Sequence, residues 1–331
     1  MKRLLTPVFA VLFSFSFGQT ITVLADKPGV SLRGLSVVTD SVVWASGSKG
    51  TVAHSADGGK TFEWMTVAGY ETRDFRDVEA FDNSTAIIMA VDAPGIILKT
   101  TDGGRNWKKV FEDTTKGMFL DAMDFNGRNG IVVGDPIKGR MFTALTTDLG
   151  NSWTKVKYGV KLDSGEAFFA SSGTNVKLLP VKRNIFRNAV VSGGTKSQFI
   201  GSGKEKLALL QGKESQGANS IAVNIPAKRI VVVGGDFAND KDTTGNCVFS
   251  TNFGTTWQCP QTSPGGYRSC VAFIDEKKLI ACGTSGVDIS GDGGNNWKAV
   301  SGESFHVCGK AKRGTAVFLA GKDGRIGKLV E

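Results

Sequence analysis

The sequence predicts an all-β fold: a seven-bladed β-propeller whose ring is closed by an N-terminal strand. Three observations lead to this prediction. They are a turn motif that recurs five times, a short apolar strand that recurs seven times, and a composition rich in glycine. The chain has 43 glycines against 8 prolines in 331 residues, with no Gly-X-Y period. So many tight turns in one chain imply many short strands.

The turn motif has Ser or Thr first, Asp or Asn third, Gly fifth and Phe or Trp eighth. Its five copies span residues 55–62, 100–107, 146–153, 250–257 and 290–297. Their aromatic ends lie 45, 46, 104 and 40 residues apart, so the long interval has room for one degenerate copy. Each repeat is long enough for four short strands, which is the composition of a propeller blade.

The chemistry of the motif is that of a hairpin turn. Asp or Asn accepts hydrogen bonds from backbone N–H groups of the turn, and glycine takes a positive φ. The aromatic residue packs against a neighbouring layer. Because the motif recurs, we interpret it as structural and not catalytic. The residues with this role are Asp57, Asp102, Asp148, Asn252 and Asp292, with Phe62, Trp107, Trp153, Trp257 and Trp297.

The apolar strand that precedes each turn ends in Gly or Asp. Its seven copies span residues 42–47, 86–92, 130–135, 188–194, 229–236, 278–283 and 315–321. The last copy is followed only by residues 325–330, so its blade lacks an outer strand. We expect Ile21–Leu24 to supply that strand, because closing the ring removes two exposed sheet edges.

The N-terminus is typical of a secretory signal peptide. Lys2 and Arg3 precede an apolar stretch from Leu4 to Phe17, and Gly18 precedes the expected cleavage site. The stretch is too short and too interrupted to span a membrane. The sequence therefore predicts a signal peptide over 1–18, a single propeller domain over 19–331, and a secreted or periplasmic monomer.

Five cysteines leave one unpaired if the others form disulfides. Cys247 and Cys259 flank one expected hairpin turn and Cys270 and Cys282 flank another, whereas Cys308 has no such counterpart. The spacing is compatible both with two hairpin disulfides and with five reduced thiols.

Charge and motifs exclude several classes of function. The net charge is +9, but basic and acidic residues are interspersed, and no nucleic-acid-binding signature occurs. No Cys/His group has the spacing of a zinc site, and no dinucleotide-binding fingerprint opens a helix. We expect no metal, no cofactor and no nucleic-acid partner.

One group of residues is a candidate site. Aligning the innermost strands of the repeats places Arg33, Arg76 and Arg268 at one position, with Leu120, Asn219 and His306 in other repeats. These residues should surround one mouth of the central channel, opposite the motif turns. Loops that open on the same face carry Asp92, Asp135 and Asp236, and Glu166 is expected to join them. A solvated rim of mixed charge is the alternative.

Four further segments stand beside the motif copies: Gly134-Asp-Pro136, Gly165-Glu-Ala-Phe-Phe-Ala-Ser-Ser-Gly173, Gly266-Tyr-Arg-Ser269 and Gly302-Glu-Ser-Phe-His306. With the Asp-box motifs they resemble a bacterial family of Asp-box (BNR-repeat) propellers related to the plant and cyanobacterial photosystem II stability/assembly factor. The resemblance covers the mature chain and implies a seven-bladed propeller. In that factor an arginine-rich face is understood to bind an assembling membrane protein. Arg33, Arg76 and Arg268 are the residues of this chain that match the arginine-rich face. Blades three, four and five have no arginine at the corresponding position.

Two functions follow as hypotheses. The first is a non-catalytic exported propeller that binds an envelope protein or a carbohydrate polymer and assists assembly or stability. The second is a sialidase-like glycoside hydrolase, in which the arginines bind a substrate carboxylate and Glu166 and Asp135 form the catalytic pair. The Phe/Tyr-Arg-Ile-Pro motif of sialidases is missing from the chain.

Overall fold

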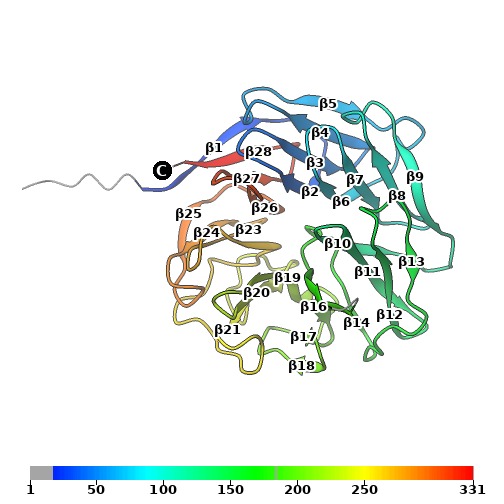
Figure 1. Ribbon diagram of the computed structural model, residues 1–331. Helices are drawn as coiled ribbons and strands as arrows, with labels where there is room; N and C mark the ends of the chain where they lie inside the picture. The colour runs from blue at the N-terminus through cyan, green and yellow to red at the C-terminus, as the bar shows by residue number, and fades with distance from the viewer. Residues whose placement is uncertain (1–17, 183–184, 331) are drawn as a thin grey trace, which may run out of the picture.

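The computed structural model describes residues 18–182 and 185–330, which form 28 β-strands and no helix. The sheets are arranged as a ring around a central axis (Figure 1). The predicted all-β propeller is therefore confirmed. Most of the predicted signal peptide, residues 1–17, lies outside the described residues. Within the described residues no helix is long and apolar enough to span a membrane.

Five sheets have four antiparallel strands each, and in four of them the strands follow the chain from the innermost outward. The first contains β2 (Leu32–Val37), β3 (Val43–Gly47), β4 (Thr51–Ser55) and β5 (Glu63–Thr66). The second contains β6 (Phe75–Ala80), β7 (Ala86–Ala90), β8 (Gly95–Thr100) and β9 (Lys108–Asp113). The third contains β10 (Leu120–Asn126), β11 (Asn129–Ile137), β12 (Arg140–Thr146) and β13 (Thr154–Lys155). Another contains β22 (Cys270–Phe273), β23 (Leu279–Gly283), β24 (Gly286–Ser290) and β25 (Lys298–Ser301).

The remaining four-stranded sheet joins the two ends of the chain. It contains β26 (Val307–Lys310), β27 (Val317–Ala320), β28 (Ile326–Val330) and, outermost, β1 (Thr20–Ala25). β1 pairs antiparallel with β28 from Thr20 opposite Val330 to Ala25 opposite Ile326. The predicted closure of the ring by an N-terminal strand is thus confirmed, and the first and last strands lie side by side in Figure 1.

The last sheet has eight strands and lies opposite this closure. It contains β14 (Glu166–Ala167), β15 (Val176–Lys182), β16 (Ile185–Gly194), β17 (Gln198–Ile200), β18 (Lys204–Lys206), β19 (Gln216–Asn224), β20 (Arg229–Asp236) and β21 (Cys247–Ser250). Gly193 of β16 pairs with Gly217 of β19 and so joins what would otherwise be two sheets. Counting this sheet as two blades brings the ring to the expected seven.

The hydrophobic core lies between neighbouring sheets. Trp44 and Val52 of the first sheet, for example, pack against Phe75, Ile88 and Leu98 of the second, and all five are buried. Residues on both faces of most strands are therefore apolar, because each sheet is covered on both sides.

The five motif copies make the predicted turns. In each copy the first residue donates from its hydroxyl to Asp or Asn and accepts from the backbone N–H of the fifth residue, at 2.7–3.0 Å. The turn also donates a backbone hydrogen bond to the loop between the first two strands of its own blade, as from Gly58 to Ser41. We call the end of the ring that carries these turns the motif face.

The fifth residue of the motif has to be glycine for two reasons. At Gly59 φ is +84°, and an added Cβ would lie 2.6 Å from Cδ1 of Leu24 in the neighbouring sheet. A side chain there would be strained and would also separate the two sheets.

Of the two alternatives for the cysteines, the structure has five free thiols and neither of the hairpin disulfides. Cys270 and Cys282 do face each other across β22 and β23, as the hairpin spacing predicted. Cys247 is buried and Cys259 is exposed, and both are free thiols. Cys270 instead donates its thiol to the carbonyl of Cys308 at 3.3 Å.

Candidate functional site

The innermost strands carry a β-bulge at the same step in four blades. The pairing register shifts between Leu32 and Gly34, Phe75 and Asp77, Leu120 and Ala122, and Ala218 and Ser220. A bulge re-aims the extra residue. The bulged residues are Arg33, Arg76, Asp121 and Asn219, near the mouth of the channel opposite the motif face. We call this end the arginine face.

Arg33, Arg76, Asn219 and His306 line one cavity of about 530 Å³ at the arginine face. Asp135, from the end of β11, lines the same cavity. The structure thus brings together four of the charged or titratable residues that the sequence placed at one mouth. Apolar and aromatic side chains complete the wall, among them Phe119, Phe168, Phe169, Phe237 and Tyr267.

A single segment closes the floor of this cavity. Residues 167–171 line the cavity on the arginine face, and residues 172–174 line a second cavity, of about 770 Å³, on the motif face. The segment is held by Arg33 Nη1, which donates to the Ser171 carbonyl at 3.2 Å, and by Ser172 Oγ, which donates to the Ser269 carbonyl at 2.7 Å. We call residues 167–174 the plug. The cavity on the arginine face is therefore blind.

The electrostatics of the cavity favour an anion. Burial lowers the pKa of the Arg33 guanidinium, and the nearby charge of Arg76 lowers it further. Burial, then Arg33 and Arg76, lower the pKa of His306 to about 3, so this imidazole is neutral at neutral pH. Arg76 Nε already pairs with Asp74 at 2.7 Å. The two neighbouring guanidinium groups still repel each other, and a ligand carboxylate between them relieves that repulsion.

A buried carboxyl group that sequence reasoning missed lies beside Arg76. Asp121 is fully buried, and neither of its oxygens has a hydrogen-bond partner of normal geometry. Burial raises the pKa of Asp121 well above its usual range, and the neighbouring Asp135 raises it further. Burial also raises the pKa of Asp135, which accepts a hydrogen bond from the Phe168 amide at 3.0 Å. The charge of Arg76 and the backbone amides of Asp135 and Ala170 offset part of this rise. Asp121 thus places a buried carboxyl group at the position equivalent to Arg33.

The aromatic wall provides an apolar surface beside the guanidinium groups. Phe237 packs edge-to-face on Phe169 and on Tyr267, with ring centroids 5.9 Å and 6.3 Å apart. It is 49% exposed, which is unusual for so large an apolar side chain. Together the wall and the arginines suit a ligand that has a carboxylate next to an aromatic or aliphatic group.

Arg268 does not line the cavity, and its predicted place at the mouth is corrected. It is 1% exposed, and it pairs with Asp288 at 2.5 Å and donates to Ser285 Oγ at 2.9 Å. Its Cα packs on Gly283 as that of Leu32 packs on Gly47, so Ser269, not Arg268, corresponds to Arg33. Aligning Leu120 in place of Asp121 was the same error, because a shift of one residue turns a side chain to the other side of a strand.

Three other predicted residues lie outside the cavity lining. Asp92 is exposed in the loop after β7. Asp236 is buried and accepts hydrogen bonds from Gln216 Nε2 and the Ala238 amide. Glu166 is buried, pairs with Lys204 at 2.8 Å and accepts from Ser192 Oγ at 2.5 Å. No group of three or more His, Cys, Asp or Glu among the described residues is arranged to hold a metal ion.

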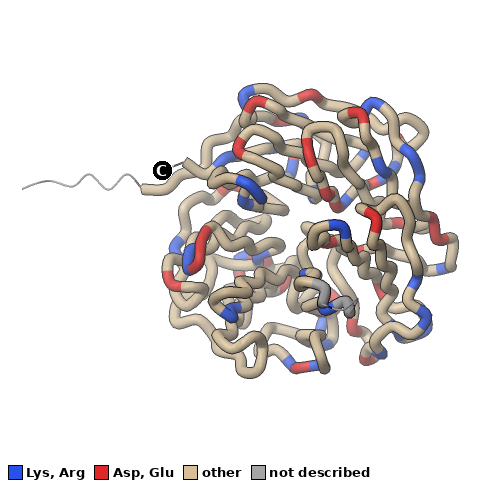
Figure 2. Tube along the Cα trace, in the orientation of Figure 1, with Lys and Arg blue, Asp and Glu red and all other residues tan. Residues whose placement is uncertain are grey.

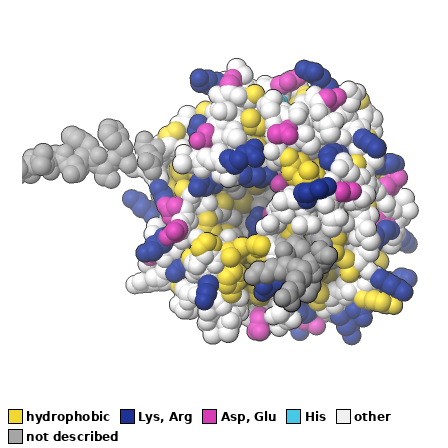
Figure 3. All heavy atoms as spheres, in the orientation of Figure 1, with side chains coloured by type: hydrophobic (Ala, Val, Ile, Leu, Met, Phe, Trp, Pro, Cys, Tyr) yellow, Lys and Arg dark blue, Asp and Glu magenta, His cyan; other side chains and the backbone are white. Residues whose placement is uncertain are grey.

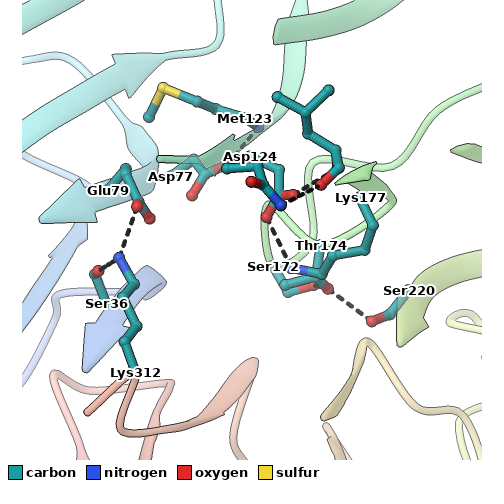
Figure 4. A network of polar contacts seen from close by, with 12 residues as sticks. Ser36, Asp77, Glu79, Met123, Asp124, Ser172, Thr174, Lys177, Ser220 and Lys312 are labelled. Carbon is teal, nitrogen blue, oxygen red and sulfur yellow. Dashed lines mark hydrogen bonds and ion pairs between the residues drawn. The ribbon is translucent and has the colours of Figure 1, made fainter. Parts of the chain in front are cut away.

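Near the motif face, polar side chains accept hydrogen bonds from backbone amides at the inner edges of the sheets (Figure 4). An innermost strand has N–H groups with no further strand to bond. Ser36 Oγ accepts from the Ala80 amide at 3.0 Å, Asp77 from Met123 at 2.6 Å, and Asp124 from Leu178 at 2.6 Å. The charged groups are also paired: Lys312 lies 2.6 Å from Glu79, and Lys177 lies 2.9 Å from Asp124.

Comparison with known proteins connects this geometry with a family. Residues 64–178 match the family model of the photosynthesis system II assembly factor YCF48. A structure of YCF48 bound to a D1 peptide is 17% identical, with a TM-score of 0.64 over 95% of this chain and 97% of that one. YCF48 from Cyanidioschyzon merolae is 18% identical, with a TM-score of 0.62 over 93% and 98%.

The chain is related to the YCF48 assembly-factor family. The propeller fold itself is shared more widely. The Pan2 WD40 domain of Neurospora crassa is 13% identical, with a TM-score of 0.60 over 92% of this chain and 89% of that one. No curated protein matches the chain.

Proposed function

We propose that this chain is an exported, non-catalytic propeller that binds a segment of a protein partner at its arginine face, as an assembly or stability factor does. The observation that carries the proposal is the blind cavity in which Arg33 and Arg76 lie beside an aromatic wall. Arginine holds carboxylates in a defined orientation, and aromatic side chains dominate the energetics of protein interfaces. The relation to YCF48, of which one structure contains a bound D1 peptide, supports a protein partner over a carbohydrate polymer.

The glycoside hydrolase is less well supported by the geometry. Its catalytic pair requires Glu166 and Asp135 to face each other across a pocket. Glu166 instead pairs with Lys204 and does not line the cavity. We therefore retain the binding function alone.

Export is part of the same proposal. β1 begins at Thr20, so cleavage after Gly18 would leave the strand that closes the ring intact. The intact mass of the protein isolated from the cell envelope should correspond to residues 19–331. A mass that retained Met1 would contradict export by this route.

The binding function is tested with the protein purified from the cell envelope of its host. The immobilised protein is used to capture partners from an extract of the same envelope. In parallel we would probe it with peptides that present a side-chain or terminal carboxylate beside Phe, Leu or Val, and with the same peptides amidated. Binding that requires the carboxylate would support the proposal. Cleavage of chromogenic glycosides, without peptide binding or protein capture, would overturn it.

A further inference from the structure

The outer edge of the third sheet is unusually basic. Residues 154–161 read Thr-Lys-Val-Lys-Tyr-Gly-Val-Lys, with three lysines and no acid. The outer strands of the neighbouring sheets do contain acids: β9 has Glu112 and Asp113 against two lysines, and β18 has Glu205 between two lysines. Figure 2 shows Lys and Arg positions along the outer edge of the third sheet.

The turn between β11 and β12 adds two more cations to this edge. Arg140 pairs with Lys161 through an isolated β-bridge and donates from Nη1 to the Gly159 carbonyl at 2.9 Å. Lys138, Arg140, Lys155 and Lys157 line one groove of about 430 Å³, with an apolar lining that includes Met118 and Met141. The cations of both segments therefore form one group.

Most of these cations have no acidic partner. Lys155 pairs with the buried carboxylate of Asp113 at 2.7 Å. Among the described residues, Lys138, Lys157 and Lys161 make no ion pair, and Arg140 bonds only to backbone. All four are exposed. Four uncompensated positive charges thus lie together on one edge.

Exposed apolar side chains alternate with these lysines. Tyr158 is 72% exposed and Val156 is 39% exposed. The Lys157 ammonium lies 5.2 Å from the centre of the Tyr158 ring. In Figure 3, at lower right, Lys and Arg side chains surround a protruding hydrophobic one at this edge. Lysines often protect sheet edges from pairing, but that role does not account for an exposed tyrosine.

We propose that this edge, defined by Lys138, Arg140, Val156, Lys157, Tyr158 and Lys161, docks on an anionic lipid surface. The cations face anionic headgroups, and Tyr158 and Val156 enter the boundary between headgroups and acyl chains. A protruding tyrosine flanked by lysines fits a fluid lipid boundary, which needs no preformed partner pocket. β11 connects this edge with Asp135 of the central cavity, so docking holds the arginine face beside the membrane. The proposal does not depend on which ligand that cavity binds.

The test measures binding of the purified protein to sedimenting vesicles. We expect the protein to bind vesicles of phosphatidylglycerol and phosphatidylcholine in equimolar mixture and not to bind vesicles of phosphatidylcholine alone. Raising the salt concentration should release the protein from the anionic vesicles. The triple variant Lys138→Glu, Lys157→Glu, Lys161→Glu should bind at least about 100-fold more weakly, since each cation near an anionic surface contributes about five-fold. Tyr158→Ser should weaken binding several-fold at every salt concentration.

The matched control carries the same change in net charge at exposed lysines outside this edge: Lys60→Glu, Lys108→Glu, Lys298→Glu. It should bind as the unmodified protein does, and all variants should keep the same thermal unfolding. Equal loss in the control would overturn the proposal, because binding would then follow net charge alone. Binding to immobilised polyglutamate without binding to anionic vesicles would also overturn it, in favour of an acidic protein partner.

Discussion

The two ends of the ring are built from the same strands, yet they treat their polar groups differently. At the motif face, Asp57 accepts from its turn, and hydrogen bonds with Thr61 lower its pKa to about 2. Asp77 and Asp124 accept hydrogen bonds from the next blade. At the arginine face, both oxygens of Asp121 lack a partner of normal geometry, and Arg33 and Arg76 lower the pKa of His306 beyond the effect of its burial. The motif face is mostly satisfied by the fold, apart from the buried Nε1 groups of Trp153 and Trp257. The arginine face retains a repulsion between Arg33 and Arg76 that a ligand carboxylate would relieve.

The largest expected effect comes from opening the ring, on which both ends depend. Deleting Thr20–Ala25 removes the outer strand of the last sheet and exposes the edge of β28. We expect loss of cooperative unfolding and aggregation at temperatures at which the unmodified protein is soluble. Substituting exposed Thr22 by Ala in the same strand is the control and should change the stability by less than about 0.5 kcal/mol. Unchanged unfolding of the deletion variant would show that the ring is stable while open.

The second prediction concerns the motif face alone. Trp297 is 5% exposed, donates from Nε1 to the Gly294 carbonyl at 3.0 Å, and packs on Val231 and Phe249 of the preceding blade. Trp297→Ala should lower the free energy of unfolding by about 3–5 kcal/mol. Below the unfolding transition its affinity for the captured partner should equal that of the unmodified protein. Weaker binding by the fully folded variant would mean that the motif face takes part in recognition.

The third prediction separates the arginines, which sequence reasoning had treated as equivalent. Arg33→Ala with Arg76→Ala should weaken partner binding at least about ten-fold, since hydrogen bonds to charged groups contribute about 1.5–3 kcal/mol each. The stability should fall by no more than about 1–2 kcal/mol, from loss of the Arg33 hydrogen bond to the Ser171 carbonyl and of the partly exposed Arg76–Asp74 pair. Arg268→Ala should instead destabilise the fold by about 3–5 kcal/mol, because it leaves Asp288 buried without a counter-charge. Affinity and urea unfolding, measured on both variants, would refute this division if the two behaved alike.

The fold could be read from the sequence because each blade repeats the same local turn chemistry, so five copies specify one architecture. The ring closure followed from the missing outer strand of the last repeat. The site was predicted less well. An alignment error of one residue put Arg268 in the place of Ser269 and Leu120 in the place of Asp121, and the β-bulge after Leu120 has no sequence signature that would reveal the error. The plug lies in one of the two repeats that lack the motif, and its contacts with Arg33 and Ser269 join residues far apart in the chain.

The smallest expected effect is that of the buried Asp121 carboxyl group, which we expect to lower the stability of the folded protein at the arginine face. Asp121 has a raised pKa in the folded protein, so its neutral form is the one that the fold favours. The free energy of unfolding is therefore highest below the pKa of this carboxyl group in the unfolded chain, near 4. It falls as the pH rises toward the pKa in the folded protein, because only the unfolded chain ionises readily in that interval. Asp121→Asn keeps the shape of the side chain but cannot ionise. Its unfolding free energy should therefore exceed that of the unmodified protein by an amount that grows as pH rises, to about 1–2 kcal/mol at neutral pH. Partner binding should weaken in the same variant if the carboxyl group contacts the ligand or holds Arg76 in place. Urea unfolding from pH 4 to pH 8 is the measurement, and parallel curves for the two proteins would show that the buried carboxyl is already compensated by the fold.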